Sequence, residues 1–155
     1  MKIDQIVAIL QESKFFTGME PDDIARVAPL CSEAAFDQGT FVFRQGERGE
    51  HLFTIVEGQV HLERAVNLGH RKGRMRIDSL GRGRTLGCWS VLLGEPHILM
   101  SSANVHRATR VLKIAGCDLR LMMTQNASFG FKMMERLCFL LRERIQAAYG
   151  AMDRF

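Results

Sequence analysis

The chain has 155 residues, of which 46% are hydrophobic and 25% are charged, and this composition is typical of a globular protein with a real core. Its net charge is +4, a modest excess that usually reflects only a solvated surface. No apolar run reaches the roughly 20 residues that a membrane span needs, and the N-terminus lacks a signal peptide, so we expect a cytoplasmic protein without a membrane segment.

Four cysteines lie far apart in the sequence and form no C-x-x-C pair: Cys31, Cys88, Cys117 and Cys138. This spacing argues against zinc and iron–sulfur sites, and the absence of a secretion signal argues against disulfides. We therefore interpret the cysteines as packing thiols, with Cys88 as the exception because of its place in the sequence. Nucleophile-elbow, Walker and dinucleotide glycine motifs are also missing, so we expect neither a metal site nor an enzyme.

The first 31 residues are predicted to be helical. Residues 3–10 form a short amphipathic helix, and a second short helix starts at Asp22 or Asp23. The apolar stripe of the first helix consists of Ile3, Ile6, Val7 and Leu10.

Residues 34–114 are predicted to form strands, because short runs rich in Val, Ile, Phe and Thr alternate there with glycines. The clearest runs are residues 40–43, 52–56 and 59–62. Turns are expected at Gly46, Gly58, Gly69, Gly73 and Gly81. Regular spacing of short strands favours a sandwich, barrel or jelly roll.

Residues 118–151 are predicted to be helical again. Asp118 is the expected N-cap of a short helix, and Asn126 or Ala127 opens a long helix that ends near Ala151. A seam with steps of three and four runs along the long helix. Its members are Ala127, Gly130, Met134, Leu137, Leu141, Arg144, Ala148 and Ala151. The seam serves either the core alone or a homodimer, and the width of the apolar face favours the homodimer.

Basic residues gather in two places, at residues 70–76 and at residues 82–84. The first cluster is predicted to be the exposed tip of a hairpin, in preference to a nucleic-acid contact.

Residues 86–97, Leu-Gly-Cys-Trp-Ser-Val-Leu-Leu-Gly-Glu-Pro-His, have the pattern of an anion site. A strand ends at a glycine and a short apolar helix follows it. The start of such a helix aims backbone N–H groups at whatever lies before it and favours phosphate.

Three further patterns carry a family resemblance. They are Phe15-Phe16 followed by Asp22-Asp23-Ile24, then Phe36-x-x-Gly39-x-x-Val42-Phe43-x-x-Gly46-Glu47, then Leu52-Phe53-x-Ile55-x-x-Gly58-x-Val60. Together with the anion-site pattern at residues 86–97, these patterns show a resemblance between residues 13–150 and a known family. Residues 13–150 resemble the cyclic-nucleotide-binding domain of catabolite activators and kinase regulatory subunits. The resemblance implies one domain over residues 1–155. Its fold would be mainly β, a double-stranded β-helix or jelly roll (a β-roll) with N-terminal helices and a long C-terminal helix.

In that family the phosphate-binding cassette reads roughly Gly-Glu-x-Ala/Ser-Leu, followed about ten residues later by Pro-Arg-Ser/Thr-Ala. The Glu accepts a hydrogen bond from the ribose, and the Arg pairs with the cyclic phosphate. In this chain Gly87 matches, but Cys88 stands at the Glu position and His97 or Met100 at the Arg position. Losing two such contacts costs about 3–6 kcal/mol, which weakens binding roughly a hundred- to ten-thousand-fold.

The predicted ligand-binding residues are Gly87, Cys88, Trp89, Ser90, His97, Ser101 and Ser102. The amides of residues 88–90, the two later serines and a protonated His97 would supply donors. Three of these residues have alternative interpretations: Trp89 as a core or interface residue, Cys88 as a small filler in place of the lost Glu, and His97 as an ordinary loop residue. If the helix start lowered its pKa, Cys88 would instead be a reactive thiol.

The function that these features indicate is a ligand-sensing regulatory module. It would bind a small anionic, nucleotide-like ligand and signal through the C-terminal helix to a partner protein. The cofactor is a cyclic nucleotide or none. The alternative is a ligand-free dimeric interaction module with a collapsed pocket. Because the chain stops at Phe155, where related transcription factors carry their helix-turn-helix, we expect no direct DNA binding.

Overall fold

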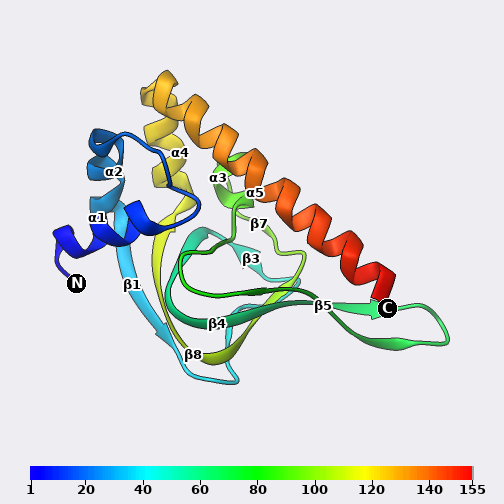
Figure 1. Cartoon of the computed structure of the whole chain (residues 1–155). Coiled ribbons are helices and arrows are strands. Elements are labelled where there is room, and N and C mark those ends of the chain that lie inside the picture. The colour runs from blue at the N-terminus through cyan, green and yellow to red at the C-terminus, as the bar shows by residue number, and fades with distance from the viewer. Residues whose placement is uncertain (155) are drawn as a thin grey trace.

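The computed structural model describes residues 1–154, in which an antiparallel β-roll lies between N-terminal helices and a long C-terminal helix (Figure 1). The helices are α1 (Ile3–Glu12), α2 (Pro21–Val27), the 3-10 turn η1 (Ala28–Leu30), α3 (Trp89–Leu93), α4 (Gly116–Gln125) and α5 (Ala127–Arg154). The strands are β1 (Cys31–Phe36), β2 (Phe41–Phe43), β3 (Arg48–Gly49), β4 (His51–Asn67), β5 (Lys72–Leu80), β6 (Thr85–Leu86), β7 (His97–Ile98) and β8 (Ser102–Ala115). The predicted β-roll with N-terminal helices and a long C-terminal helix is confirmed.

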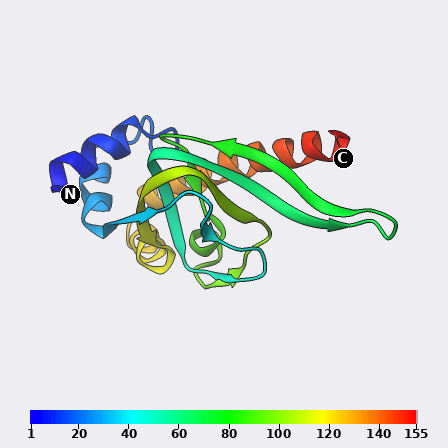
Figure 2. The ribbon, with the colours of Figure 1, turned by 90° about the horizontal axis from the view of Figure 1, so that it is seen from below.

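The main sheet has the order β1-β8-β4-β5, with β2 added to β8 and β6 added to β4, and every pair is antiparallel. β3 and β7 form a separate two-stranded ribbon. Beyond the end of the β8 pairing, β4 and β5 continue alone as a two-stranded arm that projects from the roll (Figure 2). The basic residues 70–76 belong to the tip and the outer strand of this arm, so the predicted exposed hairpin is confirmed.

Two hydrophobic clusters hold the layers together. One joins the helices to the sheet and includes the fully buried Phe16, Leu119 and Phe129. The other fills the roll with residues such as Ile55 and Leu86. Because α5 packs on α4 at its N-terminal end and along β5 at its C-terminal end, it crosses the open side of the roll (Figure 1).

The turn expected at Gly58 is wrong, because the two runs around it form one strand, β4. Gly58 has φ +110° inside that strand, and the register with β8 shifts on both sides of it. A Cβ there would meet the Ala108 carbonyl oxygen at 2.6 Å, so the glycine marks a bulge under a close backbone approach. Gly73 also lies inside a strand, β5, where a turn was expected.

The starts of the C-terminal helices were predicted with mixed success. α4 begins at Gly116 with Ala115 as its N-cap, so Asp118 lies in the first turn and is not the cap. The cap at Asn126 is confirmed, since its side-chain oxygen accepts a hydrogen bond from the Phe129 amide at 3.1 Å. Among the helices in residues 1–154, none has both the length and the apolar character needed to cross a membrane.

Candidate ligand site

The turn between β6 and α3 is fixed by Gly87. Its φ is +81°, and a Cβ at this position would collide with the carbonyl oxygen of His51 on β4. Only glycine satisfies both conditions without strain. The predicted strand–glycine–helix order is therefore present, but α3 has only five residues, so few peptide dipoles align in it.

An open cavity of about 420 Å³ lies directly beside this turn, between the roll and α5. The roll contributes the segment Leu86–Trp89 and side chains that include Phe43, Leu62, Ile77, Leu99 and Met100. The helix α5 contributes Leu141, Arg144, Ile145 and Ala148. Any molecule that fills the cavity therefore touches both the roll and α5.

Four of the seven predicted site residues line the cavity: Gly87, Cys88, Trp89 and Ser101. Ser90 does not, because it lies on the buried face of α3, where its hydroxyl donates to the Gly87 carbonyl at 3.4 Å. Ser102 lies outside as well, and its hydroxyl accepts a hydrogen bond from the Gln45 amide at 2.9 Å.

His97 also lies off the cavity wall, on β7, with its ring 6.2 Å from the Trp89 ring. Both ring nitrogens are buried without a hydrogen-bond partner. Burial lowers the pKa of His97 below the ordinary 6.5, so the imidazole is neutral at pH 7. The expectation that a protonated His97 donates to a ligand is not supported by this environment.

Cys88 occupies the position next to Gly87 and is 6% exposed. Burial raises its pKa to about 11, so the group is a neutral thiol at pH 7 and not the reactive thiolate considered from the sequence. All four cysteines are free, and Cys117 and Cys138 are exposed, so the packing interpretation fails for these two.

Arg144 is the cavity residue that the sequence analysis missed as a site residue. Its side chain, 17% exposed, extends from α5, and its Nη2 donates to the carbonyl oxygen of Thr85. Its Nη1 is buried without a hydrogen-bond partner and lies 3.7 Å from Oδ2 of Asp78. The only signal in the sequence was a charged residue inside the apolar seam of the long helix.

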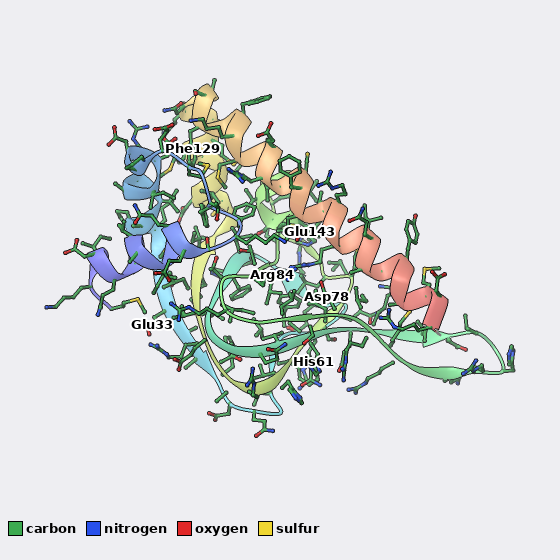
Figure 3. The ribbon with its side chains drawn as sticks, viewed as in Figure 1. Glu33, His61, Asp78, Arg84, Phe129 and Glu143 are labelled. Carbon is green, nitrogen blue, oxygen red and sulfur yellow. The ribbon has the colours of Figure 1, made fainter. Side chains whose placement is uncertain are left out.

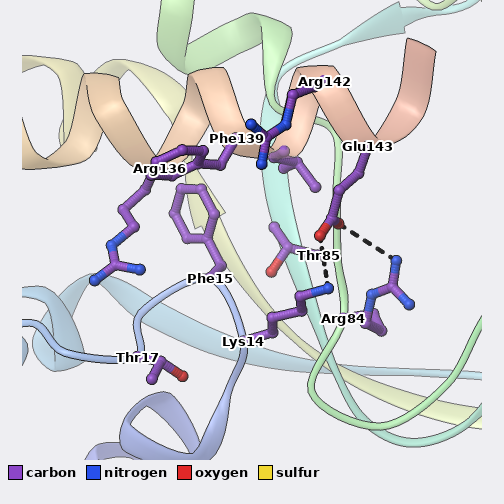
Figure 4. A pocket seen from close by; sticks show the side chains of 10 residues that line it. Lys14, Phe15, Thr17, Arg84, Thr85, Arg136, Phe139, Arg142 and Glu143 are labelled. Carbon is purple, nitrogen blue, oxygen red and sulfur yellow. Dashed lines mark ion pairs between the residues drawn. The ribbon is translucent and has the colours of Figure 1, made fainter. Parts of the chain in front are cut away.

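Arg144 belongs to an ion network through its contact with Asp78, and Figure 3 labels three other members of that network, Asp78, Arg84 and Glu143. Asp78 on β5 lies 3.8 Å from Arg84, and Arg84 lies 3.6 Å from Glu143 on α5. Lys14 adds a contact of 2.6 Å to Glu143 from the segment after α1 (Figure 4). The network therefore links the N-terminal segment, the roll and α5.

Burial alone would raise the pKa of Glu143. The hydrogen bond from Lys14 and the charges of Lys14, Arg84 and Arg144 instead bring it below the ordinary value. For Arg144, burial and the charge of Arg84 lower the pKa, although Asp78 and Glu143 oppose that shift.

A second cavity, of about 340 Å³, opens on the other side of this network (Figure 4). Lys14, Arg84, Arg136 and Arg142 surround it, and Glu143 is the one carboxylate among its described lining residues. It includes none of the predicted site residues, so we take the cavity beside Gly87 as the candidate site. Within residues 1–154, no group of three or more His, Cys, Asp or Glu side chains is placed to hold a metal ion.

Comparison with known proteins finds relatives of this chain among cyclic-nucleotide-regulated proteins. The chain is 31% identical over 91 residues to a cGMP-dependent protein kinase of Caenorhabditis briggsae, and the match covers 59% of this chain and 12% of the kinase. It is 27% identical over 134 residues to a CRP-like cAMP-activated global transcriptional regulator of Mycobacterium tuberculosis, covering 86% of this chain and 58% of the regulator. The chain thus spans only part of these relatives.

A solved structure with the same fold is a cyclic nucleotide-binding domain from Methylobacillus flagellatus. Its TM-score is 0.77 at 20% identity, and the match covers 96% of this chain and 80% of that one. Residues 33–126 match the sequence profile of the cyclic nucleotide-binding domain, and that range contains all of the roll but the first two residues of β1, together with Gly87 and the roll side of the cavity. The chain therefore belongs to the cyclic nucleotide-binding domain family.

Proposed function

We propose that this protein is a regulatory, non-catalytic module of the cytoplasm that binds a small anionic ligand in the cavity beside Gly87. Ligand binding would change how α5 packs on the roll, and a partner would detect that change. The observation that carries the proposal is the shared wall, since Leu86–Trp89 and α5 line the same cavity. A ligand contacting both elements has a different affinity for the docked and undocked positions of α5, and this difference is what shifts a conformational equilibrium.

The rest of the interface between α5 and the roll supports this mechanism. It consists partly of charged contacts, in which Glu143 meets Arg84 and Lys14. Partly exposed ion pairs of this kind are worth about 1 kcal/mol or less. Part of the docking of α5 therefore rests on weak contacts that a ligand of modest affinity can reinforce.

A cyclic nucleotide is the ligand that family membership suggests. The proposal includes weak binding of this ligand, because Cys88 replaces the family's carboxylate and neither His97 nor Met100 supplies its arginine. In this sense the cassette is degenerate. The neutral state of the buried Cys88 thiol supports the argument, since it offers no charged acceptor to a ribose hydroxyl.

The test is a titration of the purified protein with cyclic AMP and cyclic GMP by calorimetry and thermal shift. Hydrogen exchange along α5 is measured on the same samples. The expected result is weak binding in the millimolar range with slower exchange in α5. Binding without any change in the exchange of α5 would contradict the signalling step.

A second candidate is the ligand-free dimeric interaction module. It is favoured by the outward face of α5, where large apolar side chains remain exposed. They are Phe131, Tyr149 and Met152, whereas the exposed Phe139 and Ile145 lie at the edges of the two cavities. The predicted seam is not this face, because Gly130, Leu137 and Ala151 are buried within the chain itself. If α5 forms a homodimer, it does so through the exposed residues.

A further inference from the structure

The walls of the cavity beside Gly87 are apolar apart from a few groups. The aliphatic and aromatic side chains of Phe43, Leu62, Ile77, Leu141 and Ile145 form most of the surface. Among the described lining residues none has a carboxylate, and the charged ones are Arg64 and Arg144. Arg64 is exposed and already donates to the Met100 carbonyl, so Arg144, whose side chain is largely but not fully buried, is the inner charge of this cavity.

The guanidinium of Arg144 has hydrogen-bonding capacity left over. Nη2 is bonded to Thr85, whereas Nη1 is buried with no acceptor and its nearest carboxylate oxygen is 3.7 Å away. A buried donor without a partner is costly, and more so when it is charged. An acceptor supplied by a ligand would remove that cost.

The charged groups around Arg144 include one more cation than carboxylate, so one positive charge has no matching anion. Asp78 faces both Arg84 and Arg144, and Glu143 faces Arg84 and Lys14. Three cations thus share two carboxylates, and the remaining positive charge is closest to the cavity at Arg144. A carboxylate at position 88 would have neutralised it, but the residue there is a neutral thiol.

We infer that the cavity binds an organic monoanion with an apolar body, and that Arg144 of α5 holds its charged group. The inference rests on the proposed ligand-sensing function and narrows its ligand class. The volume of about 420 Å³ suits a small organic molecule, and the apolar wall suits a body with few hydroxyl groups. Because the anchor is on α5, the charge of the ligand would itself tie α5 to the roll.

The experiment uses a matched pair of fluorescent probes, anilinonaphthalene sulfonate and its neutral analogue phenylnaphthylamine. Energy transfer from Trp89, the only tryptophan, reports binding at the cavity it lines. The wild-type protein should bind the sulfonate about ten- to a hundred-fold more tightly than the neutral probe, as a hydrogen bond to a charged group predicts. The variant Arg144→Met should lose this preference.

Two further variants separate binding from folding. Arg142→Met makes the same change at an exposed position of α5 and should keep the preference of the wild type. Arg144→Lys keeps the charge without the fork of donors and should retain part of the preference. Equal binding of both probes by the wild type, no binding of either, or an unchanged preference in Arg144→Met would overturn the inference.

Cyclic AMP separates the inference from the function on which it rests. As a competitor of the sulfonate it should be weaker than an apolar carboxylate such as indoleacetate, because its ribose meets no carboxylate here. If cyclic AMP binds, protects α5 and is unaffected by Arg144→Met, the proposed function stands and the inference fails. If the sulfonate preference depends on Arg144 but α5 is not protected, the inference stands and the signalling fails.

Discussion

Single residues decide the shape of the candidate site. Gly87 allows the chain to turn under β4, Cys88 leaves the wall uncharged, and Arg144 brings a charge from another element. The first two were identified from the sequence because they lie in one continuous motif. Arg144 was not, because it lies more than fifty positions further along the chain and only the folded structure brings it to the cavity.

Replacing Gly87 by alanine should destabilise the protein by more than the strain of a positive φ alone. That strain costs about 1–3 kcal/mol, and the collision with the His51 carbonyl adds to it. Gly39→Ala is the matched control, since Gly39 has φ +85° and open space where a Cβ would lie. Urea unfolding of both variants should show the larger loss for Gly87→Ala, and equal losses would contradict the described contact.

At the scale of elements, the sequence predicted helices and the roll better than it predicted where strands join. The stripe in α1 and the Asn126 cap are local signals, and both gave the right structure. The continuity of β4 through Gly58 is not local, because it depends on the approach of Ala108 and Thr109 from β8. The burial of the α5 seam likewise depends on the roll beneath it.

The contact of α5 with the network should depend on pH through Glu143. The folded-state pKa of Glu143 is lowered from its ordinary value of 4.5. The ionised Glu143 side chain therefore adds to the free energy of unfolding at any pH above 4.5, and this stabilisation is lost as the pH falls through the lowered pKa. Glu143→Gln should therefore be less stable than the wild type at pH 7, by about 1 kcal/mol or less. Thermal unfolding from pH 7 down to pH 3 should show the two proteins converging.

Glu135→Gln is the control for this series, since Glu135 is an exposed residue of the same helix. It should behave like the wild type at every pH. A difference between wild type and Glu143→Gln that stays constant to low pH would mean that the charge of Glu143 does not contribute.

For the whole molecule, the order helices, roll, long helix was predictable because composition changes sharply between the three parts. The face of α5 that packs on the roll was not predictable, because apolar residues occur around most of the circumference of this helix. Leu137 and Leu140 face inward whereas Phe131 and Tyr149 face outward, and all four are ordinary apolar positions in the sequence. Packing against the roll, and not the step of three and four, selects the buried ones.

If the outward face of α5 pairs two copies of the chain, Tyr149→Glu should shift the protein toward the monomer, because a charge would be placed in an apolar contact. Leu121→Glu on α4 is the control, as Leu121 is 56% exposed and Tyr149 is 65% exposed. Sedimentation velocity over a range of concentrations measures the outcome. A wild-type protein that stays monomeric at every concentration would contradict the dimer.

The arm formed by β4 and β5 depends on its neighbour. Beyond Glu63 it has only two strands, and an isolated two-stranded hairpin is marginally stable in water. The C-terminal end of α5 supplies the missing support, because Ala151 and Arg154 line a hollow together with Met75 on the arm. The arm should therefore stay folded only while the C-terminal end of α5 packs against it. If α5 moved away, trypsin would cleave the arm at its basic residues more rapidly.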